Sequence, residues 1–291
     1  MERMRRRRRP SPSDRRGELL ALAREDAAAR RPTDLVRQWI DDATVRPSAT
    51  DQRTATAYDA LALESAPEYE ALLLSPVAPL GTSSVVAPMS QDRILTTIRP
   101  NEVVSDPTNV LALEAARRLR DDPAGHVRLC TAHQVLRMQS VPPGVGFTRH
   151  FRLFSLLDAG PSRPDDGFEV DAVVAQLGIH LRILTAASER FGLQWRDPIA
   201  KIFADDRLPA IADRLSSALS AAHPDLGIEH APLESAYYGG LRVKLIVHDR
   251  TGTPCDWIDL GAHDWVARLT SNRRRRCIAS AVGIQLLPRL G

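Results

Sequence analysis

Residues 127–160 decide how this chain is expected to fold. They read VRLCTAHQVLRMQ (127–139), SVPPGVGFTR (140–149) and HFRLFSLLDAG (150–160). The first and third segments are mostly apolar, and the middle segment carries two prolines and two glycines. This composition favours two strands joined by a loop. We therefore expect a long antiparallel ribbon with an antiparallel sheet built around it.

Further strands are expected on both sides of the ribbon. Before it, residues 94–106 (ILTTIRPNEVVSD) predict a hairpin whose turn contains Pro100 and Asn101. After it, apolar runs alternate with turns in three segments, which are YYGGLRVKLIVHD (237–249), CDWIDLG (255–261) and RCIASAVGIQLL (276–287). We expect these segments to be strands of the same sheet.

Helices are expected around the sheet, because apolar residues recur at helical spacing between the strands. The predicted helices are residues 17–30, 33–43, 51–74, 109–120, 168–191, 207–222 and 264–269. Pro67 interrupts the third of them. There is no internal repeat and no Gly/Ser linker after residue 16. We therefore predict one α+β domain over residues 17–291, with a helical N-terminal part at residues 17–75.

The charge of the chain is unevenly distributed. Residues 1–16 (MERMRRRRRPSPSDRR) hold eight arginines against two acids, so +6 of charge lies there and the other residues sum to −3, for a net charge of +3. Because like charges repel and PSPS has nothing to bury, we expect residues 1–16 to be a disordered leader. With 43% hydrophobic residues, the rest can fill a core. Its weakly acidic balance argues against a broad nucleic-acid-binding face.

The cysteines and the lack of long apolar runs indicate the cellular compartment in which the protein is expected. Cys130, Cys255 and Cys277 lie far apart and form no CxxC pair or Cys/His cluster. This pattern argues against a disulfide framework and a zinc site, and it fits a reducing environment. No apolar run approaches the roughly 20 residues of a membrane span. We therefore expect a cytoplasmic protein with no membrane partner.

The order of the units and of their short motifs is more specific than any one motif. A hairpin ends in Asp-x-Thr, and a helix, an Arg-bearing strand, a glycine loop, a returning strand, a Tyr-Tyr pair, a Gly-x-x-Asp turn and an Ala-Val-Gly strand follow. This order resembles the catalytic core of class II aminoacyl-tRNA synthetases, specifically histidyl-tRNA synthetase and its paralogue, the regulatory subunit of ATP phosphoribosyltransferase. The resemblance covers about residues 50–291. It implies a class II synthetase-like antiparallel sheet flanked by helices, and a homodimer.

The resemblance also implies roles for individual residues. Asp106 and Thr108 stand where a carboxylate and a hydroxyl hold the substrate α-amino group. Arg137 stands where the catalytic arginine grips the carboxylate and the α-phosphate of an adenylate, since a guanidinium binds two oxygens at once. The remaining expected ligand-binding residues are Gln139, Phe151 as the ring stacked on adenine, Tyr237, Tyr238 and Asp264.

Several positions depart from the family pattern. Leu153 and Leu157 replace the Gln and Glu that contact the histidine ring, so the expected pocket is apolar and selects a nonpolar side chain. Leu233 and Ala262 stand where arginines are expected. Arg289 is one residue out of register with the arginine of the third motif, and no helix follows it. These changes remove cations that the chemistry of the family uses.

The same residues have structural interpretations. Two roles explain the presence of Arg137 equally well, a salt bridge within the sheet and contact with a phosphate. Asp106 and Thr108 suit a helix N-cap, a role that is compatible with ligand binding. If the adjacent Tyr237 and Tyr238 lie in a strand, one side chain points inward and the other outward.

Three other features are expected to be structural. Asp264 can cap the helix at 264–269. The run Arg273–Arg276 is expected to form a solvated face. Four histidines show no spacing typical of metal ligands, so we expect no metal site. They are His133, His150, His180 and His263.

Two functional hypotheses follow. In the first, the protein is a divergent histidyl-tRNA synthetase-like core that binds an amino acid, ATP or both, and activates the amino acid by adenylation with ATP and Mg²⁺. Charging of tRNA is not expected, because no anticodon-binding segment follows the core. In the second, the protein is a non-catalytic regulatory or scaffold subunit without cofactors that acts on a partner enzyme, because the missing arginines weaken transition-state stabilisation. Binding of tRNA or DNA by the Arg-rich segments is a weaker third possibility.

Overall fold

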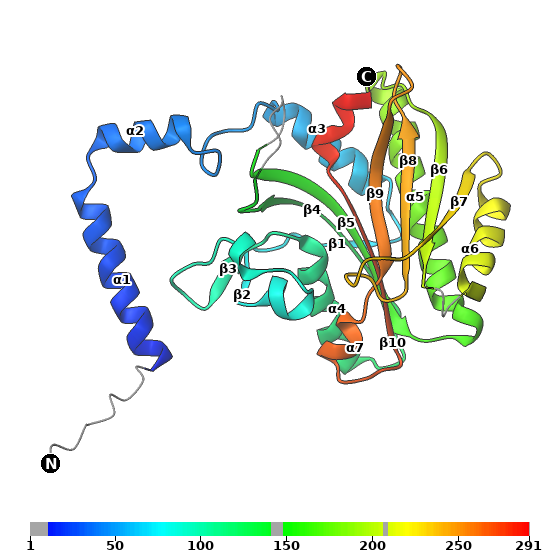
Figure 1. The fold of residues 1–291 in the computed structure, drawn as a ribbon, viewed down its shortest axis with the longest axis horizontal. Helices are drawn as coiled ribbons and strands as arrows, with labels where there is room; N and C mark the ends of the chain where they lie inside the picture. The colour runs from blue at the N-terminus through cyan, green and yellow to red at the C-terminus, as the bar shows by residue number, and fades with distance from the viewer. Residues whose placement is uncertain (1–10, 141–147, 206–208, 291) are drawn as a thin grey trace, which may run out of the picture.

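A computed structural model describes residues 11–140, 148–205 and 209–290. In these residues a mixed eight-stranded sheet forms the centre of the molecule, and helices lie on both of its faces (Figure 1). This architecture confirms the predicted α+β class and the sheet flanked by helices.

The strands cross the sheet in the order β1-β4-β5-β10-β9-β8-β6-β7. Their bounds are β1 Glu70–Ala71, β4 Val127–Leu136, β5 His150–Pro161, β6 Arg196–Ala204, β7 Gly227–Pro232, β8 Leu241–His248, β9 Pro254–Ala262 and β10 Arg275–Val282. The predicted ribbon is the pair β4 and β5, which runs antiparallel from Leu136 opposite His150 to Val127 opposite Ala159. The other inner pairs are antiparallel as well.

The two edges of the sheet correct the expectation of a purely antiparallel arrangement. β1 pairs with β4, and β7 with β6, in parallel. A helix lies between the two strands of each pair in the chain, α4 (Pro107–Asp121) in the first and α6 (Pro209–Ala222) in the second. Such a crossover returns the chain in the same direction. β6 and β7 were not expected, because each contains a proline, Pro198 and Pro232, which obscures a strand pattern.

One face of the sheet holds the main core. It is covered by α3 (Gln52–Glu64), α5 (Gly167–Phe191) and α6, and Leu177 of α5 belongs to the same buried cluster as Val243 and Leu260 of the sheet. The short helices η3 (Pro164–Asp166) and η4 (Ile284–Leu290) precede α5 and follow β10. The predicted third helix ends at Glu64, before the interrupting proline.

The other face is only partly covered. α4 and α7 (Trp265–Leu269) pack over β4, β5 and β10, where Leu111, Leu129 and Ala279 are buried together. Over β8 and β9 the described part of the chain places no helix, and polar side chains such as Arg242 lie there.

A second, two-stranded sheet lies beside α4. β2 (Val77–Pro79) pairs with β3 (Asn101–Val103), and the short helices η1 (Thr82–Val86) and η2 (Gln91–Arg93) lie between them in the chain. The predicted hairpin is present, since the N–H of Thr97 donates to the carbonyl of Asn101. The turn therefore forms as expected around Pro100 and Asn101.

The first two helices extend away from the rest of the chain (Figure 1). α1 (Pro12–Ala29) and α2 (Pro32–Asp41) bury no residue. α1 starts after Ser11, whose hydroxyl accepts the N–H of Asp14 while the Asp14 carboxylate accepts that of Ser11. Because of this capping box, residues 12–16 are helical and the expected disordered leader does not extend to residue 16. Residues 1–10 lie outside the described residues.

α5 is long and apolar enough to cross a membrane by composition. Eleven of its residues are buried, and three of them, Glu169, Gln176 and His180, are polar groups bonded to the sheet. Gln176 donates to the carbonyl of Ile278 (3.1 Å), and Nε2 of His180 lies 2.9 Å from Oγ of Ser280. Burial of this kind is typical of the core helix of a soluble protein.

Candidate functional site

A cleft of ≈ 640 Å³ opens on the sheet between the start of α4 and β9. Its lining comes from the end of β4, the segment 88–93, the turn before β8, and strands β9 and β10. Six of the eight residues expected to contact the ligand line it, namely Asp106, Thr108, Arg137, Gln139, Tyr237 and Tyr238. The fold thus gathers motifs that lie far apart in the chain.

Asp106 is both an N-cap and a cleft residue. Its Oδ1 accepts hydrogen bonds from the Thr108 N–H (3.0 Å) and the Thr108 hydroxyl (2.7 Å), which caps α4. The Asp106 side chain is 12% exposed, and its Oδ2 faces Arg137. Capping uses one oxygen and leaves the other for a second partner.

Arg137 is fixed on one side and open on the other. Its Nε donates to the carbonyl of Ser105 (2.9 Å), and its guanidinium lies over the Phe151 ring, 5.2 Å from the centroid. Its Nη2 is 3.7 Å from Oδ2 of Asp106, which is too long for a hydrogen bond. Within the described residues the Nη groups make no hydrogen bond. They can therefore bind an anion that enters the cleft.

A buried carboxylate holds the segment 88–93 in place as a wall. Glu102 is 1% exposed and accepts the N–H groups of Gly81 and Ser83, both at 2.8 Å. It also accepts from Nε2 of Gln91 (2.9 Å). Burial opposes the charge of Glu102, but these hydrogen bonds outweigh it and lower the pKa of Glu102. The segment is thus anchored by an ionised group.

Four rings form an aromatic wall. Tyr237 and Tyr238 lie in the turn before β8, not in a strand, so both of their rings line the cleft and the expected inward and outward alternation is wrong. The rings of His263 and Trp265 stack 3.7 Å apart at 17°, and each tyrosine ring lies 5.3 Å from that of His263. These four residues, Tyr237, Tyr238, His263 and Trp265, are called the aromatic wall below.

The place of the Tyr238 ring depends on a glycine. A methyl group at Gly261 would overlap the Tyr238 ring and approach the carbonyl oxygen of Leu241. Only glycine lets the ring lie this close to the backbone of β9. The Gly-x-x-Asp turn therefore contributes to the cleft through its glycine.

The aromatic wall is uncharged near neutral pH. Burial, together with the nearby carboxylate of Asp106, raises the pKa of Tyr237. Burial and the carboxylate of Asp259 likewise raise the pKa of Tyr238. Burial lowers the pKa of His263 to about 3. The tyrosine hydroxyls keep their protons and the His263 ring is neutral, so the charge of the cleft comes from its acids and arginines.

Asp259 is a second carboxylate in the cleft, and it was not predicted. Arg242 of β8 binds it through two hydrogen bonds, Nε to Oδ1 (2.7 Å) and Nη2 to Oδ2 (2.6 Å). The Arg242 guanidinium also lies over the Tyr238 ring, 5.0 Å from its centroid. A pattern that indicates Asp259 is present in the sequence, because it stands between the buried Ile258 and Leu260 of one strand and must face away from the main core.

The residues expected to contact adenine and the ligand side chain are only partly in the cleft. Arg137 covers a face of the Phe151 ring, and Phe151 is not part of the lining. Leu153 lines the cleft, but Leu157 is fully buried under α4. Selection of a nonpolar side chain would therefore depend on Leu153 and the aromatic wall, not on Leu157.

Asp264 lies outside the cleft. It precedes α7 without capping it, and it forms an ion pair with Arg268 at 3.7 Å. It lines a second hollow together with Ala262, whereas Leu233 lines a third. The position of Asp264 thus matches neither of its two expected roles, substrate contact and helix capping.

Some expected parts of the site cannot be placed. Gly146 and Phe147 of the glycine loop, and the Arg289 side chain, lie outside the described residues. In the parts of the chain that are described, no group of three His, Cys, Asp or Glu residues is arranged to hold a metal ion.

Comparisons with known proteins identify the fold. No protein-family model matches the chain, and no curated protein matches its sequence significantly. An ATP phosphoribosyltransferase regulatory subunit/histidyl-tRNA synthetase from Bacillus halodurans matches in structure with a TM-score of 0.61 and 13% identity, over 84% of this chain and 83% of that chain. Apo S. aureus histidyl-tRNA synthetase matches with a TM-score of 0.63 and 12% identity, over 86% of this chain and 68% of that chain.

The chain has the fold of a histidyl-tRNA synthetase core. A histidine–tRNA ligase subunit from Alicyclobacillus acidocaldarius shares it as well, with a TM-score of 0.57 and 14% identity over 83% of this chain and 95% of that chain. The predicted resemblance to a histidyl-tRNA synthetase-like class II core is thereby confirmed for the fold. At such low identity the likeness of this histidyl-tRNA synthetase-like core extends to architecture alone.

Proposed function

We propose that this histidyl-tRNA synthetase-like core binds an amino acid in the cleft. The observation that supports it is the convergence of two carboxylates, Asp106 and Asp259, with the arginine Arg137 around one aromatic wall. An α-ammonium group would be attracted mainly to Asp106, because Asp259 is already paired with Arg242, and an α-carboxylate would bind the open Nη groups of Arg137. A zwitterion therefore complements the site better than an anion or a cation alone.

The side chain of the amino acid would lie against the aromatic wall and Leu153. These groups are uncharged near neutral pH, and rings of this kind favour an apolar or aromatic partner. Histidine is a poor candidate, because Leu153 and Leu157 stand where polar partners of its ring are expected, and an unpaired ring nitrogen is costly.

Adenylation is the reaction that such a site would serve. A carboxylate oxygen of the amino acid attacks the α-phosphorus of ATP, a P–O bond forms, and pyrophosphate leaves with the electron pair of the broken bond. Arg137 would neutralise charge at the α-phosphate, and Arg93 also lines the cleft. Mg²⁺ would be held largely by the phosphates of ATP, as is usual for this ion.

Two measurements on purified protein test the proposal. Amino-acid-dependent exchange of pyrophosphate into ATP, screened over the common amino acids, tests adenylation. Calorimetric titration with the same amino acids tests binding. Exchange supports the full proposal, and binding without exchange supports a regulatory or scaffold role. The absence of binding would overturn the proposal altogether.

The resemblance also supports a homodimer, which remains part of this proposal. Sedimentation equilibrium at micromolar concentration is expected to give twice the 32.1 kDa mass of the chain. A single species at the monomer mass would contradict it. The absence of tRNA charging and a cytoplasmic location stay predictions from the sequence, and neither is needed for amino-acid binding.

A further inference from the structure

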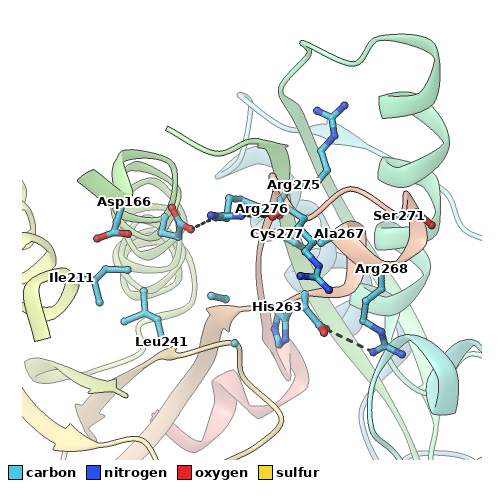
Figure 2. Close-up of a pocket in the computed structure, with 15 residues that line it drawn as sticks. Asp166, Ile211, Leu241, His263, Ala267, Arg268, Ser271, Arg275, Arg276 and Cys277 are labelled. Carbon is cyan, nitrogen blue, oxygen red and sulfur yellow. Dashed lines mark hydrogen bonds and ion pairs between the residues drawn. The ribbon is translucent and has the colours of Figure 1, made fainter. Parts of the chain in front are cut away.

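A second hollow, of ≈ 600 Å³, lies at the end of the sheet near the start of α5 (Figure 2). It exists because β9 separates from β10. The two strands pair only from Asp259 opposite Ala281 to Ala262 opposite Ile278, and the chain then turns into α7. Beyond the hydrogen bond from the His263 N–H to the carbonyl of Cys277 (2.9 Å), Arg275 and Arg276 of β10 have no strand on that side among the described residues. The start of α5, α7 and the turn before β8 surround the space.

Arginines dominate the lining of this hollow, which we call the arginine pocket. They are Arg268, Arg273, Arg275 and Arg276, against the three carboxylates of Asp166, Glu169 and Asp264. Figure 2 shows Arg268, Arg275 and Arg276 around the space, with His263 beside it. The expected solvated face at 273–276 is therefore only partly solvated, because Arg275 is 7% exposed.

Each carboxylate of the pocket already has an arginine partner. Glu169 lies 2.7 Å from Nε of Arg276. Asp264 lies 3.7 Å from Nη1 of Arg268, and both pairs are drawn as dashed lines in Figure 2. Asp166 accepts from Nη1 of Arg214 at 2.6 Å. No carboxylate in the lining is left to neutralise the other two arginines.

Arg273 and Arg275 are the arginines without a counter-charge. Arg275 donates from Nη1 to the carbonyl of Pro123, but its buried Nε has no hydrogen-bond partner among the described residues. No ion pair or hydrogen bond in the described part of the chain engages the Arg273 guanidinium. Burying an arginine without a counter-charge or full hydrogen bonding costs free energy, which a bound anion would offset.

We propose that the arginine pocket binds the phosphate group of a small molecule. A planar guanidinium can bind two phosphate oxygens at once, and two such groups suit a dianion. The volume fits a ligand of metabolite size, and the concave shape favours a small molecule over an extended nucleic-acid backbone. Because His263 lines both this pocket and the cleft, the phosphate site adjoins the proposed amino-acid site.

Calorimetric titration of the full chain with inorganic phosphate and with ribose 5-phosphate tests the proposal. Both probes lack adenine and an amino group, and a variant of Arg137 controls for their binding to the arginine of the cleft. Wild-type protein is expected to bind at least one probe at one site per chain. Stronger binding of ribose 5-phosphate would indicate a phosphomonoester ligand, and equal binding a free phosphate.

The variants separate this pocket from other sources of binding. Arg273→Ala is expected to weaken binding at least tenfold, because the exposed Arg273 lines the pocket, and the backbone carbonyl that accepts from Arg276 is kept in the variant. Arg274→Ala is the matched control, since Arg274 is the exposed neighbour outside the lining. Arg137→Ala removes the anion-binding arginine of the cleft, so saturable binding that persists in this variant comes from outside the cleft, as expected for the arginine pocket.

Three results would overturn the proposal. They are no saturable binding at millimolar concentration, equal weakening by Arg273→Ala and Arg274→Ala, and loss of binding in Arg137→Ala. The first two would leave a diffuse basic surface, and the third would place the phosphate in the cleft. None of them bears on amino-acid binding, which is measured with different ligands.

Discussion

Nη2 of Arg137 and Oδ2 of Asp106 face each other at 3.7 Å in the wall of the cleft. Each group is fixed by a different neighbour, Asp106 by the Thr108 hydroxyl and Arg137 by the carbonyl of Ser105. The two charges are therefore close without forming a hydrogen bond to each other. An amino acid brings one partner for each, an ammonium for Asp106 and a carboxylate for Arg137.

The two roles of Asp106 can be separated by a pair of variants. Asp106→Asn keeps an oxygen that can cap α4, so the free energy of unfolding is expected to stay within ~0.5 kcal/mol of the wild type. Asp106→Ala loses the cap and is expected to cost about 1 kcal/mol. Both remove the carboxylate and should weaken amino-acid binding at least tenfold. Urea unfolding and calorimetry measure the two effects, and an Asn variant with wild-type affinity would contradict the binding role.

Gly261 is expected to control the aromatic wall. Gly261→Ala should push the Tyr238 ring away from β9, because the new methyl group would overlap it. We expect a loss of about 1–3 kcal/mol in the free energy of unfolding, from overpacking, and weaker amino-acid binding. Near-ultraviolet circular dichroism reports the displaced ring. Gly17→Ala is the control, since a methyl group there meets nothing within 4 Å. Equal spectra for both variants would argue against the close approach.

The first two helices are expected to add little to the stability of the sheet. α1 and α2 bury no residue, and Leu35, Trp39 and Ile40 of α2 are more than half exposed. Removal of residues 1–42 should therefore shift the Tm of the remaining chain by less than about 2 °C. Differential scanning calorimetry measures this. A large drop in Tm, or loss of cooperative unfolding, would show that these helices pack on the core.

Buried histidines are expected to make the fold sensitive to acid. Burial lowers the pKa of His180 to about 3, whereas an unfolded histidine titrates near 6.5. Below pH 6.5 the unfolded state binds the proton and the folded state does not, so stability is full above that pH and falls as the pH drops towards 3. At pH 5 this loss is about 2 kcal/mol for His180.

His180→Gln should therefore lose about 2 kcal/mol less than the wild type between pH 7 and pH 5 in urea unfolding. The exposed His230 gives a control, because His230→Gln is expected to retain the full loss. His263, whose burial lowers its pKa to about 3 as well, adds a similar dependence that both variants keep. Identical pH profiles for His180→Gln and the wild type would contradict the burial of a neutral ring.

Local patterns were sufficient for much of the fold. The ribbon of β4 and β5 and the long helix α5 follow from apolar spacing within single segments. The parallel edges do not, because the direction in which β7 joins β6 depends on how α6 packs. The boundary of the leader also depends on one local detail, the Ser11–Asp14 capping box.

The residues of the site also fall into two groups, those that a local motif predicts and those that only the tertiary fold brings to the cleft. Asp106 and Arg137 stand in motifs that the sequence displays directly, and both line the cleft. Alternation within β9 indicates that Asp259 faces away from the main core, but Asp259 and Trp265 reach the cleft because β9 and α7 both lie next to β10, which no short motif records. Asp264 shows the converse, since its motif is present but the turn directs it into the arginine pocket.

Calorimetric titration of the twenty amino acids into wild-type protein and the Asp106→Asn variant tests the central claim most directly. The account predicts saturable binding of at least one apolar or aromatic amino acid to the wild type, weakened at least tenfold in the variant. Failure of every amino acid to bind, or equal affinity of both proteins for the one that does, would contradict it.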